Sequence, residues 1–218
     1  MKGTVKMKIA LINENSQASK NKMIYEVLKD VAEAHGHIVY NYGMYSAGDE
    51  HSLTYVMNGL LASILLTSRA VDFVVTGCGT GEGAMLACNS FPNVHCGYVA
   101  GPCDAYLFGQ INAGNAISMP FAKGFGWGGE LNLRYTFEKL FSKKFGGGYP
   151  EERAQVEQNN KKILDSVKAI SYRTLPEILN DIDPTFLKST VSGPKFKKYF
   201  FKNCQNREIA QIIRKTLA

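Results

Sequence analysis

The chain has 218 residues, a formal net charge of +6 and 45% hydrophobic residues, which is enough for one core and a small appendage. It lacks an apolar run of the roughly 20 residues that span a bilayer, and its start, Met1–Lys8, leads directly into a strand without a signal-peptide region. Five cysteines without C-x-x-C spacing argue against a disulfide framework and a structural zinc site. We therefore expect a cytoplasmic protein with reduced thiols, no bound metal and no membrane partner.

The predicted elements alternate between short strands and helices. Strands are predicted over five apolar segments: 8–12, 37–40, 71–75, 94–99 and 116–119. Helices are predicted between and after them: about 19–34, 55–65, 83–90, 104–111, 129–141 and 151–167. This alternation is typical of a doubly wound, mostly parallel α/β sheet with helices on both faces and ligands at the carboxyl ends of its strands.

The C-terminal part of the sequence predicts a separate helical extension. A glycine-rich break at Gly146–Gly148 precedes a long polar helix, and Pro176, Pro184 and Pro194 divide the residues that follow. We place one domain over residues 1–168 and a small, mainly helical extension over residues 169–218.

Most of the positive charge belongs to this extension. Nine Lys/Arg and four Asp/Glu fall between Ser171 and Ala218, and lysines alternate with aromatic residues in Pro194–Lys202. Such alternation would suit a groove for single-stranded nucleic acid, and a steep salt dependence of binding would mark that function. It is more typical of a segment that buries its rings and keeps its lysines in water, so we expect no nucleic-acid partner.

The most informative segment is Val74–Gly83, in which an apolar strand breaks into alternating glycines around Cys78 and Thr80. Cys78 is predicted at the point where the strand passes into a helix. Glycines there let backbone N–H groups approach a ligand, and a helix N-terminus favours negative charge. The usual role of cysteine as a small buried hydrophobe explains Cys88 and Cys96, but alternating glycines do not build a core.

Other chemistries of this loop fit less well. Gly79-x-Gly81-x-x-Ala84 satisfies a dinucleotide-binding pattern, with Asp104 at about the expected distance for its acidic residue. That pattern belongs after the first strand, whereas this loop follows the third. A Walker loop would need a Gly-Lys-Ser/Thr sequence, and a redox pair would need a second cysteine where Gly81 stands. A single cysteine acting as base or nucleophile remains, and we expect no cofactor.

Several separated motifs share an order along the chain: the acid Glu14 after the first strand, the Cys78–Gly83 loop, the pair Asn112 and Asn115, and a G-G-x-x-x-x-R segment that ends at Arg153. From about residue 8 to residue 163, the sequence resembles the sugar-phosphate isomerase family of ribose-5-phosphate isomerase B and the galactose-6-phosphate isomerase subunits. The resemblance implies a flavodoxin-like, three-layer fold with a five-stranded parallel sheet, and no metal or organic cofactor. It also implies a homodimer, or a tetramer, whose active sites use residues from two chains.

The resemblance also implies roles for individual residues. Aldose–ketose isomerisation through an enediolate needs a base for the carbon-bound proton and donors for the developing oxyanion. By resemblance, Cys78 is the base, Thr80 helps to move the hydroxyl proton and the Asn112 amide stabilises the oxyanion. The backbone N–H groups of three glycines would assist: Gly79, Gly81 and Gly83. The further substrate-binding residues would be Glu14, Asn15, Asn115, Tyr149 and Arg153.

Four positions depart from the family pattern. Ile111 replaces the histidine credited with opening a furanose ring, and Asn15 replaces a histidine after the first-strand acid. Gly109 and Tyr149 stand where the family has arginines, so that only Arg153 matches its phosphate-binding pair directly. Binding of a phosphate would have to be rebuilt from other groups, for which Asn15, Tyr149, Lys20 and Lys123 are candidates.

The missing histidine predicts a substrate that is already open-chain. A tetrose 4-phosphate has its O4 esterified and cannot close a furanose, whereas a pentose 5-phosphate can. The sequence therefore favours a tetrose 4-phosphate such as erythrulose 4-phosphate, with ribose 5-phosphate as the alternative. A non-catalytic sugar-phosphate-binding protein is a third hypothesis, which the presence of both Cys78 and Thr80 disfavours.

Overall fold

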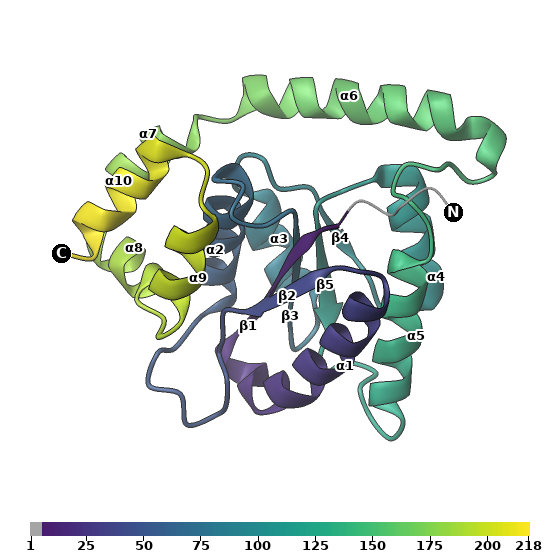
Figure 1. The fold of residues 1–218 in the computed structure, drawn as a ribbon, viewed down its shortest axis with the longest axis horizontal. Coiled ribbons are helices and arrows are strands. Elements are labelled where there is room, and N and C mark those ends of the chain that lie inside the picture. The colour runs from purple at the N-terminus through teal and green to yellow at the C-terminus, as the bar shows by residue number, and fades with distance from the viewer. Residues whose placement is uncertain (1–5) are drawn as a thin grey trace.

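A computed structural model describes residues 6–218 as a five-stranded sheet between layers of helices (Figure 1). The strands are β1 (Lys8–Asn13), β2 (Ile38–Asn41), β3 (Phe73–Cys78), β4 (Cys96–Tyr98) and β5 (Ala116–Pro120). Their order is β2-β1-β3-β5-β4, and every neighbouring pair is parallel. The predicted three-layer α/β fold is confirmed.

One side of the sheet departs from the simple flavodoxin order, in which the fifth strand would lie at the edge. Here β5 lies between β3 and β4. Four of the five residues of β5 are buried, whereas β4 has three residues, of which only Cys96 is buried. The longer, more apolar strand thus occupies the inner position. As a result, the segment after β5 lies directly beside the loop after β3.

Helices cover both faces of the sheet. One face carries α1 (Asn21–Ala34), α4 (Pro102–Leu107) and α5 (Gly129–Phe141), and the other carries α2 (Tyr55–Thr67) and α3 (Glu82–Asn89). Gly59 allows α2 and α3 to approach closely, since a Cβ there would lie 2.5 Å from the Ala87 carbonyl oxygen. Within residues 6–218, no helix combines the length and apolar character needed to cross a membrane.

The element boundaries differ from the predicted ones at functionally relevant places. The predicted strand over 71–75 extends to Cys78, which is its last residue. Residues 15–20 form a 3-10 turn before α1 because Glu14 caps them, and a π-helical turn, Phe108–Asn112, continues α4. The strand predicted over 94–99 shortens to the three residues of β4.

The C-terminal part consists of a long helix and four short ones. These are α6 (Ala154–Ser171), α7 (Leu175–Asp181), α8 (Pro184–Val191), α9 (Phe196–Asn203) and α10 (Arg207–Thr216). Helix α6 crosses the predicted boundary at 168–169, runs over the body and leads to a group of short helices beside α2 (Figure 1). Phe196 and Phe200 are buried in the core over α2, while Lys197 and Lys198 are exposed. This segment therefore docks its aromatic rings on the domain.

Candidate active site

The carboxyl ends of β1 and β3 form the crevice in which doubly wound sheets bind ligands. After β1, the chain adds β2 on one side of the sheet. After β3, it adds β4 and β5 on the other side, so the direction in which strands are added reverses between β1 and β3. The register pairs Asn13 with Gly77. Glu14, the residue after β1, and Cys78, the last residue of β3, therefore lie next to each other.

The Cys78 sulfur lies between the end of β3 and the start of α3, and the residue is 9% exposed. The Gly81 N–H donates a hydrogen bond to Sγ at 3.2 Å, and the Thr80 hydroxyl lies 3.9 Å from Sγ. The Glu82 N–H donates to Thr80 Oγ1 at 3.3 Å and holds the hydroxyl beside the thiol. A backbone donor and the N-terminus of α3 therefore face the sulfur.

Glycines give this loop its tight geometry. Gly81 has a φ of +81° and its ideal Cβ would lie 2.8 Å from the Met119 carbonyl carbon, so an L side chain is excluded there on two grounds. At Gly77 a Cβ would overlap the Met119 carbonyl oxygen on β5. Gly79 lies in the same loop, and Gly83 lies in the first turn of α3.

The segment after β5 holds the Cys78–Gly83 loop in place. The N–H groups of Ala122 and Lys123 donate to the Gly79 carbonyl at 3.0 and 2.9 Å. The Lys123 ammonium also forms an ion pair with Glu82 at 3.1 Å across the two loops. Lys123, a candidate phosphate ligand in the sequence, thus lies at this edge of the sheet but already has a carboxylate partner.

Glu14 and Asn15 form the β1 side of the crevice. The Glu14 carboxylate, only 3% exposed, accepts hydrogen bonds from the Ser16 N–H at 2.9 Å and from the Ser16 hydroxyl. The exposed Asn15 donates its backbone N–H to the Leu53 carbonyl at 2.7 Å and its side-chain amide to Ser52 at 3.5 Å. Glu14 shapes the turn after β1, and Asn15 presents a polar side chain at its rim.

A buried polar pair that was not predicted from the sequence lies beneath this crevice. Asn58 on α2 and Thr76 on β3 are fully buried. The Asn58 side-chain amide lies 3.1 Å from the Thr76 hydroxyl and 3.2 Å from the Glu14 N–H, and the Thr76 hydroxyl donates to the Ile12 carbonyl at 2.8 Å. The pair ties β1 to β3 directly below Glu14 and Cys78. Asn58 stands within an otherwise apolar helix, and this was the sequence signal from which the pair could have been predicted.

Three other predicted residues gather at the opposite, amino-terminal edge of the sheet. Asn112 and Glu157 line a cavity of about 160 Å³. The Tyr149 N–H donates to the Glu157 carboxylate at 3.2 Å, and Arg153 Nε lies 3.7 Å from it. The buried Glu157 thus contacts Tyr149 and Arg153, and it lines one cavity together with Asn112 and Ile111.

One chain does not bring the two groups of residues together. Asn115 immediately precedes β5, and Cys78 is in register with Pro120 at the far end of that strand. The length of β5, five residues or about 16 Å, therefore separates the amino edge of the sheet from its carboxyl edge. We call the first group the carboxyl-edge half-site: Cys78, Thr80, Gly79, Gly81, Gly83, Glu14 and Asn15. The second group is the amino-edge half-site: Asn112, Tyr149 and Arg153.

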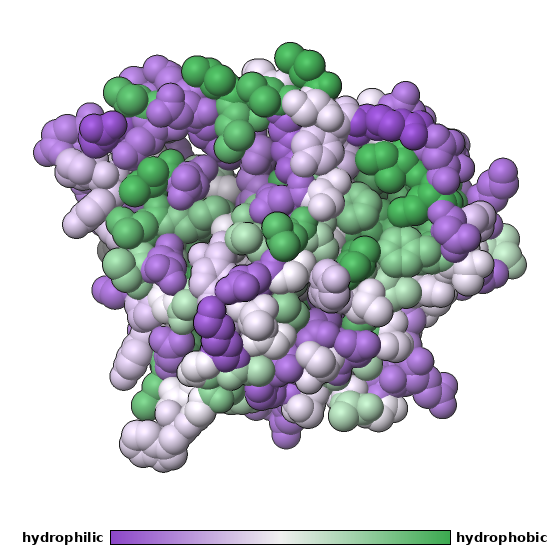
Figure 2. Space-filling view, turned by 180° about the vertical axis from the view of Figure 1, so that it is seen from behind, coloured by the Kyte–Doolittle hydropathy of each residue, from purple (hydrophilic) through white to green (hydrophobic). Residues whose placement is uncertain are grey.

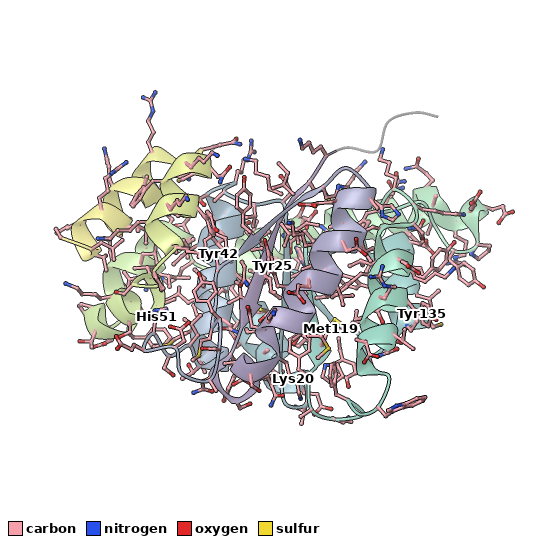
Figure 3. The ribbon with its side chains drawn as sticks, turned by 60° about the horizontal axis from the view of Figure 1, so that its bottom comes forward. Lys20, Tyr25, Tyr42, His51, Met119 and Tyr135 are labelled. Atoms are coloured by element: carbon pink, nitrogen blue, oxygen red, sulfur yellow. The ribbon has the colours of Figure 1, made fainter. Side chains whose placement is uncertain are left out.

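Asn115 and Lys20, both expected near the substrate, are engaged by the backbone of their own chain. The Asn115 amide accepts from the His95 N–H and donates to the Asn93 carbonyl, both at 2.7 Å. The Lys20 ammonium donates to the Phe121 carbonyl and ties the turn before α1 to the segment after β5. Figure 3 shows Lys20 and Met119 together in that region. Because their polar groups have these structural partners, we leave both residues out of the site.

The thiol, the hydroxyl and the backbone donors at the β1–β3 crevice suit proton transfer on a small ligand. A family model described as ribose/galactose isomerase matches residues 9–158, and a second, described as ribose-5-phosphate isomerase, matches residues 170–216. The chain belongs to the ribose/galactose isomerase family, and it is a sugar isomerase.

Two solved structures are similar to almost the whole chain. A 4-deoxy-L-threo-5-hexosulose-uronate ketol-isomerase, complexed with a tartrate, is 62% identical, with a TM-score of 0.95 over 97% of this chain and 99% of its own. A ribose-5-phosphate isomerase from Vibrio parahaemolyticus is 54% identical, with a TM-score of 0.95 over 97% of this chain and 100% of its own. A ribose 5-phosphate isomerase from Thermotoga maritima, 23% identical over 69% of this chain and 97% of its own, shares the fold with a TM-score of 0.53. The curated proteins include no match.

Proposed function

We propose that this protein interconverts the aldose and ketose forms of an open-chain sugar acid of the 4-deoxy-5-hexosulose-uronate type, with Cys78 as the base. The observation that carries the proposal is Ile111, which lines the same cavity as Asn112 of the amino-edge half-site. An aliphatic side chain cannot transfer the protons that ring opening requires. A substrate that does not form a ring needs no such group.

The chemistry of that compound fits this feature. It lacks a hydroxyl at C4 and carries a carbonyl at C5, so neither position offers an oxygen to close a furanose or pyranose on the C1 aldehyde. The ketol-isomerase named for this compound is 62% identical to the chain. A tetrose 4-phosphate, which the sequence alone favours, is also confined to the open form and remains the second candidate.

The charge of the amino-edge half-site favours the sugar acid over the phosphate. Arg153 is the arginine that remains of the pair with which the family binds phosphate, and Tyr149 occupies the other position. One guanidinium pairs well with a singly charged carboxylate through two parallel hydrogen bonds, whereas a phosphate dianion calls for more positive charge. The related ketol-isomerase was also solved with tartrate, a dicarboxylate.

The proposed reaction requires no group beyond the two half-sites. The Cys78 thiolate removes the proton from C2, and the electron pair forms the C1–C2 double bond of the enediolate while charge develops on O1. The loop N–H groups and the Asn112 amide stabilise that charge. Thr80, 3.9 Å from the sulfur, assists transfer of the O2 proton toward O1, and Cys78 returns its proton to C1.

The two half-sites become one site if a second copy of the chain supplies the amino-edge residues. Helix α6 has an exposed stripe for such a contact: Val156, Ile163, Val167 and Ile170 are 51–86% exposed and follow the spacing of a coiled-coil seam. From behind, apolar side chains gather along the upper rim of the molecule, where α6 lies (Figure 2). We therefore include a homodimer in the proposal, with α6 packed against its symmetry mate.

A panel of three substrates tests the assignment. We expect kcat/KM for 4-deoxy-L-threo-5-hexosulose-uronate to exceed that for ribose 5-phosphate by at least about 100-fold, or roughly 2.7 kcal/mol, because the enzyme lacks a group for ring opening. Erythrulose 4-phosphate is the third member of the panel. Because it is also open-chain, comparing it with the uronate shows whether the enzyme prefers a sugar acid or a sugar phosphate. Equal efficiency on ribose 5-phosphate would contradict the inference from Ile111 that the substrate is open-chain. A preference for erythrulose 4-phosphate would instead make a tetrose 4-phosphate the substrate.

The variant Ile111→His tests the same position directly. It is expected to raise kcat/KM for ribose 5-phosphate more than for the open-chain acid, because an imidazole can exchange the ring-opening proton. Ile111→Phe is the matched control, since it introduces a ring without ionisable nitrogens. The interpretation of Ile111 fails if His and Phe at this position have the same effect on ribose 5-phosphate.

A further inference from the structure

The loop between β2 and α2, residues 42–54, forms one wall of the carboxyl-edge half-site. The Asn13 N–H donates to the Gly43 carbonyl at 2.6 Å, and the Asn15 N–H donates to the Leu53 carbonyl at 2.7 Å. Both ends of the loop are thus bonded to the end of β1, on either side of Glu14. The position of Asn15 depends directly on the conformation of this loop.

The outer side of the same loop contacts the C-terminal extension. His51 Nε2 donates to the Ser189 carbonyl on α8 at 2.6 Å. Gly193 packs against the His51 ring, because a Cβ at Gly193 would lie only 3.2 Å from the ring carbon Cε1. The Lys195 ammonium lies 4.6 Å from the centre of the Tyr45 ring. In Figure 3, His51 lies beside the short helices of the extension.

A loop of this length needs such support to keep one conformation. Ordering its backbone costs conformational entropy at every residue, and long loops without secondary structure are otherwise heterogeneous. The bonds to β1 hold the ends of the loop, and the Asp49 carboxylate accepts the Tyr45 and His51 N–H groups within it. The bond from His51 to Ser189 connects the part of the loop near α2 to a packed helix.

We propose that the C-terminal extension is a positioning element of the active site, and that His51 is the residue through which it acts. The extension fixes His51, His51 fixes the loop over residues 42–54, and the loop fixes Asn15 just after the carboxyl end of β1. His51 is a positioning residue and does not contact the substrate. The inference rests on the proposed function in taking Asn15 as a substrate-binding residue.

The variant His51→Leu removes the hydrogen-bond donor and keeps a side chain of moderate size. The change leaves the half-buried Ser189 carbonyl without this donor and releases the loop, so we expect KM for the open-chain acid to rise about tenfold. The turnover number should change less than about threefold, because the Cys78 loop has its own supports. His51→Gln, which offers an amide N–H in a similar place, is expected to restore most of the affinity.

A second variant separates positioning from general stability. Tyr40→Phe removes another bond between the domain and the extension, from the Tyr40 hydroxyl to Asn203 at 3.4 Å, without touching the loop. We expect it to leave KM unchanged. Amide hydrogen exchange gives a readout that needs no substrate, in which the Asn15 N–H should exchange faster in His51→Leu and at the wild-type rate in Tyr40→Phe.

These experiments distinguish a failure of the positioning role of His51 from a failure of the proposed function. Unchanged Asn15 exchange and unchanged KM in His51→Leu would overturn the positioning role, as would equal effects of His51→Leu and Tyr40→Phe. If the wild-type protein turns over none of the three substrates, the proposed function fails, while hydrogen exchange still tests whether His51 orders the loop.

Discussion

Replacing Cys78 by alanine is expected to lower kcat by about 10²- to 10⁴-fold, the usual contribution of a positioned base. The change removes the group that we propose takes the proton from C2 but little packing volume, so the fold and the KM should be nearly unaffected. Cys78→Ser is expected to be almost as inactive, because a serine hydroxyl is a much weaker base at neutral pH. Steady-state kinetics together with thermal unfolding would measure both effects.

Cys204→Ala is the matched control for this experiment, because Cys204 lies in the extension between α9 and α10 and plays no part in the proposed chemistry. It should retain wild-type turnover. The assignment of Cys78 as base is wrong if Cys78→Ala keeps more than about a tenth of kcat, which corresponds to a barrier change below about 1.4 kcal/mol.

Introducing a charge into the apolar stripe of α6 should abolish both assembly and activity. Ile163 is 62% exposed in the single chain, and in a symmetric dimer Ile163→Glu would place two carboxylates in the same apolar seam. Burying each charge costs several kcal/mol, more than the contact of one isoleucine contributes. We expect a monomer by sedimentation at low micromolar concentration and a loss of kcat/KM of at least about 100-fold.

Ala169→Glu controls for the added charge, since Ala169 is exposed on the same helix outside the stripe. This variant should remain dimeric and active. A wild-type monomer with full activity would contradict the shared site, because the two half-sites of one chain lie at opposite edges of the sheet.

The sequence predicted the elements around Cys78 well because their signals are local. Glycines at alternate positions, a β-branched run before them and an apolar helix after them together place the cysteine at the carboxyl end of a strand. The structure confirms this position and adds only that β3 extends to Cys78 itself. The docking of Phe196 and Phe200 was also predicted from a local pattern, the alternation of lysines with aromatic residues.

The division of the site between two edges was harder to predict because it depends on contacts that are distant in sequence. Residues that precede a parallel strand lie at its amino end, so the position of Asn115 before β5 was a usable signal. The exchange of β4 and β5 in the strand order and the bond from His51 to Ser189 have no comparable local signature. They arise from the packing of whole elements.

The placement of the two half-sites at opposite edges has a genetic consequence. In the proposed dimer, a chain without Cys78 and a chain without Asn112 would each be inactive alone, yet a mixed dimer would join the intact edge of one chain to the intact edge of the other. Random pairing of equal amounts would make half of the dimers mixed, with one working site in each, so about a quarter of all sites would recover. Mutations at the two edges would therefore complement each other, whereas two mutations at the same edge would not.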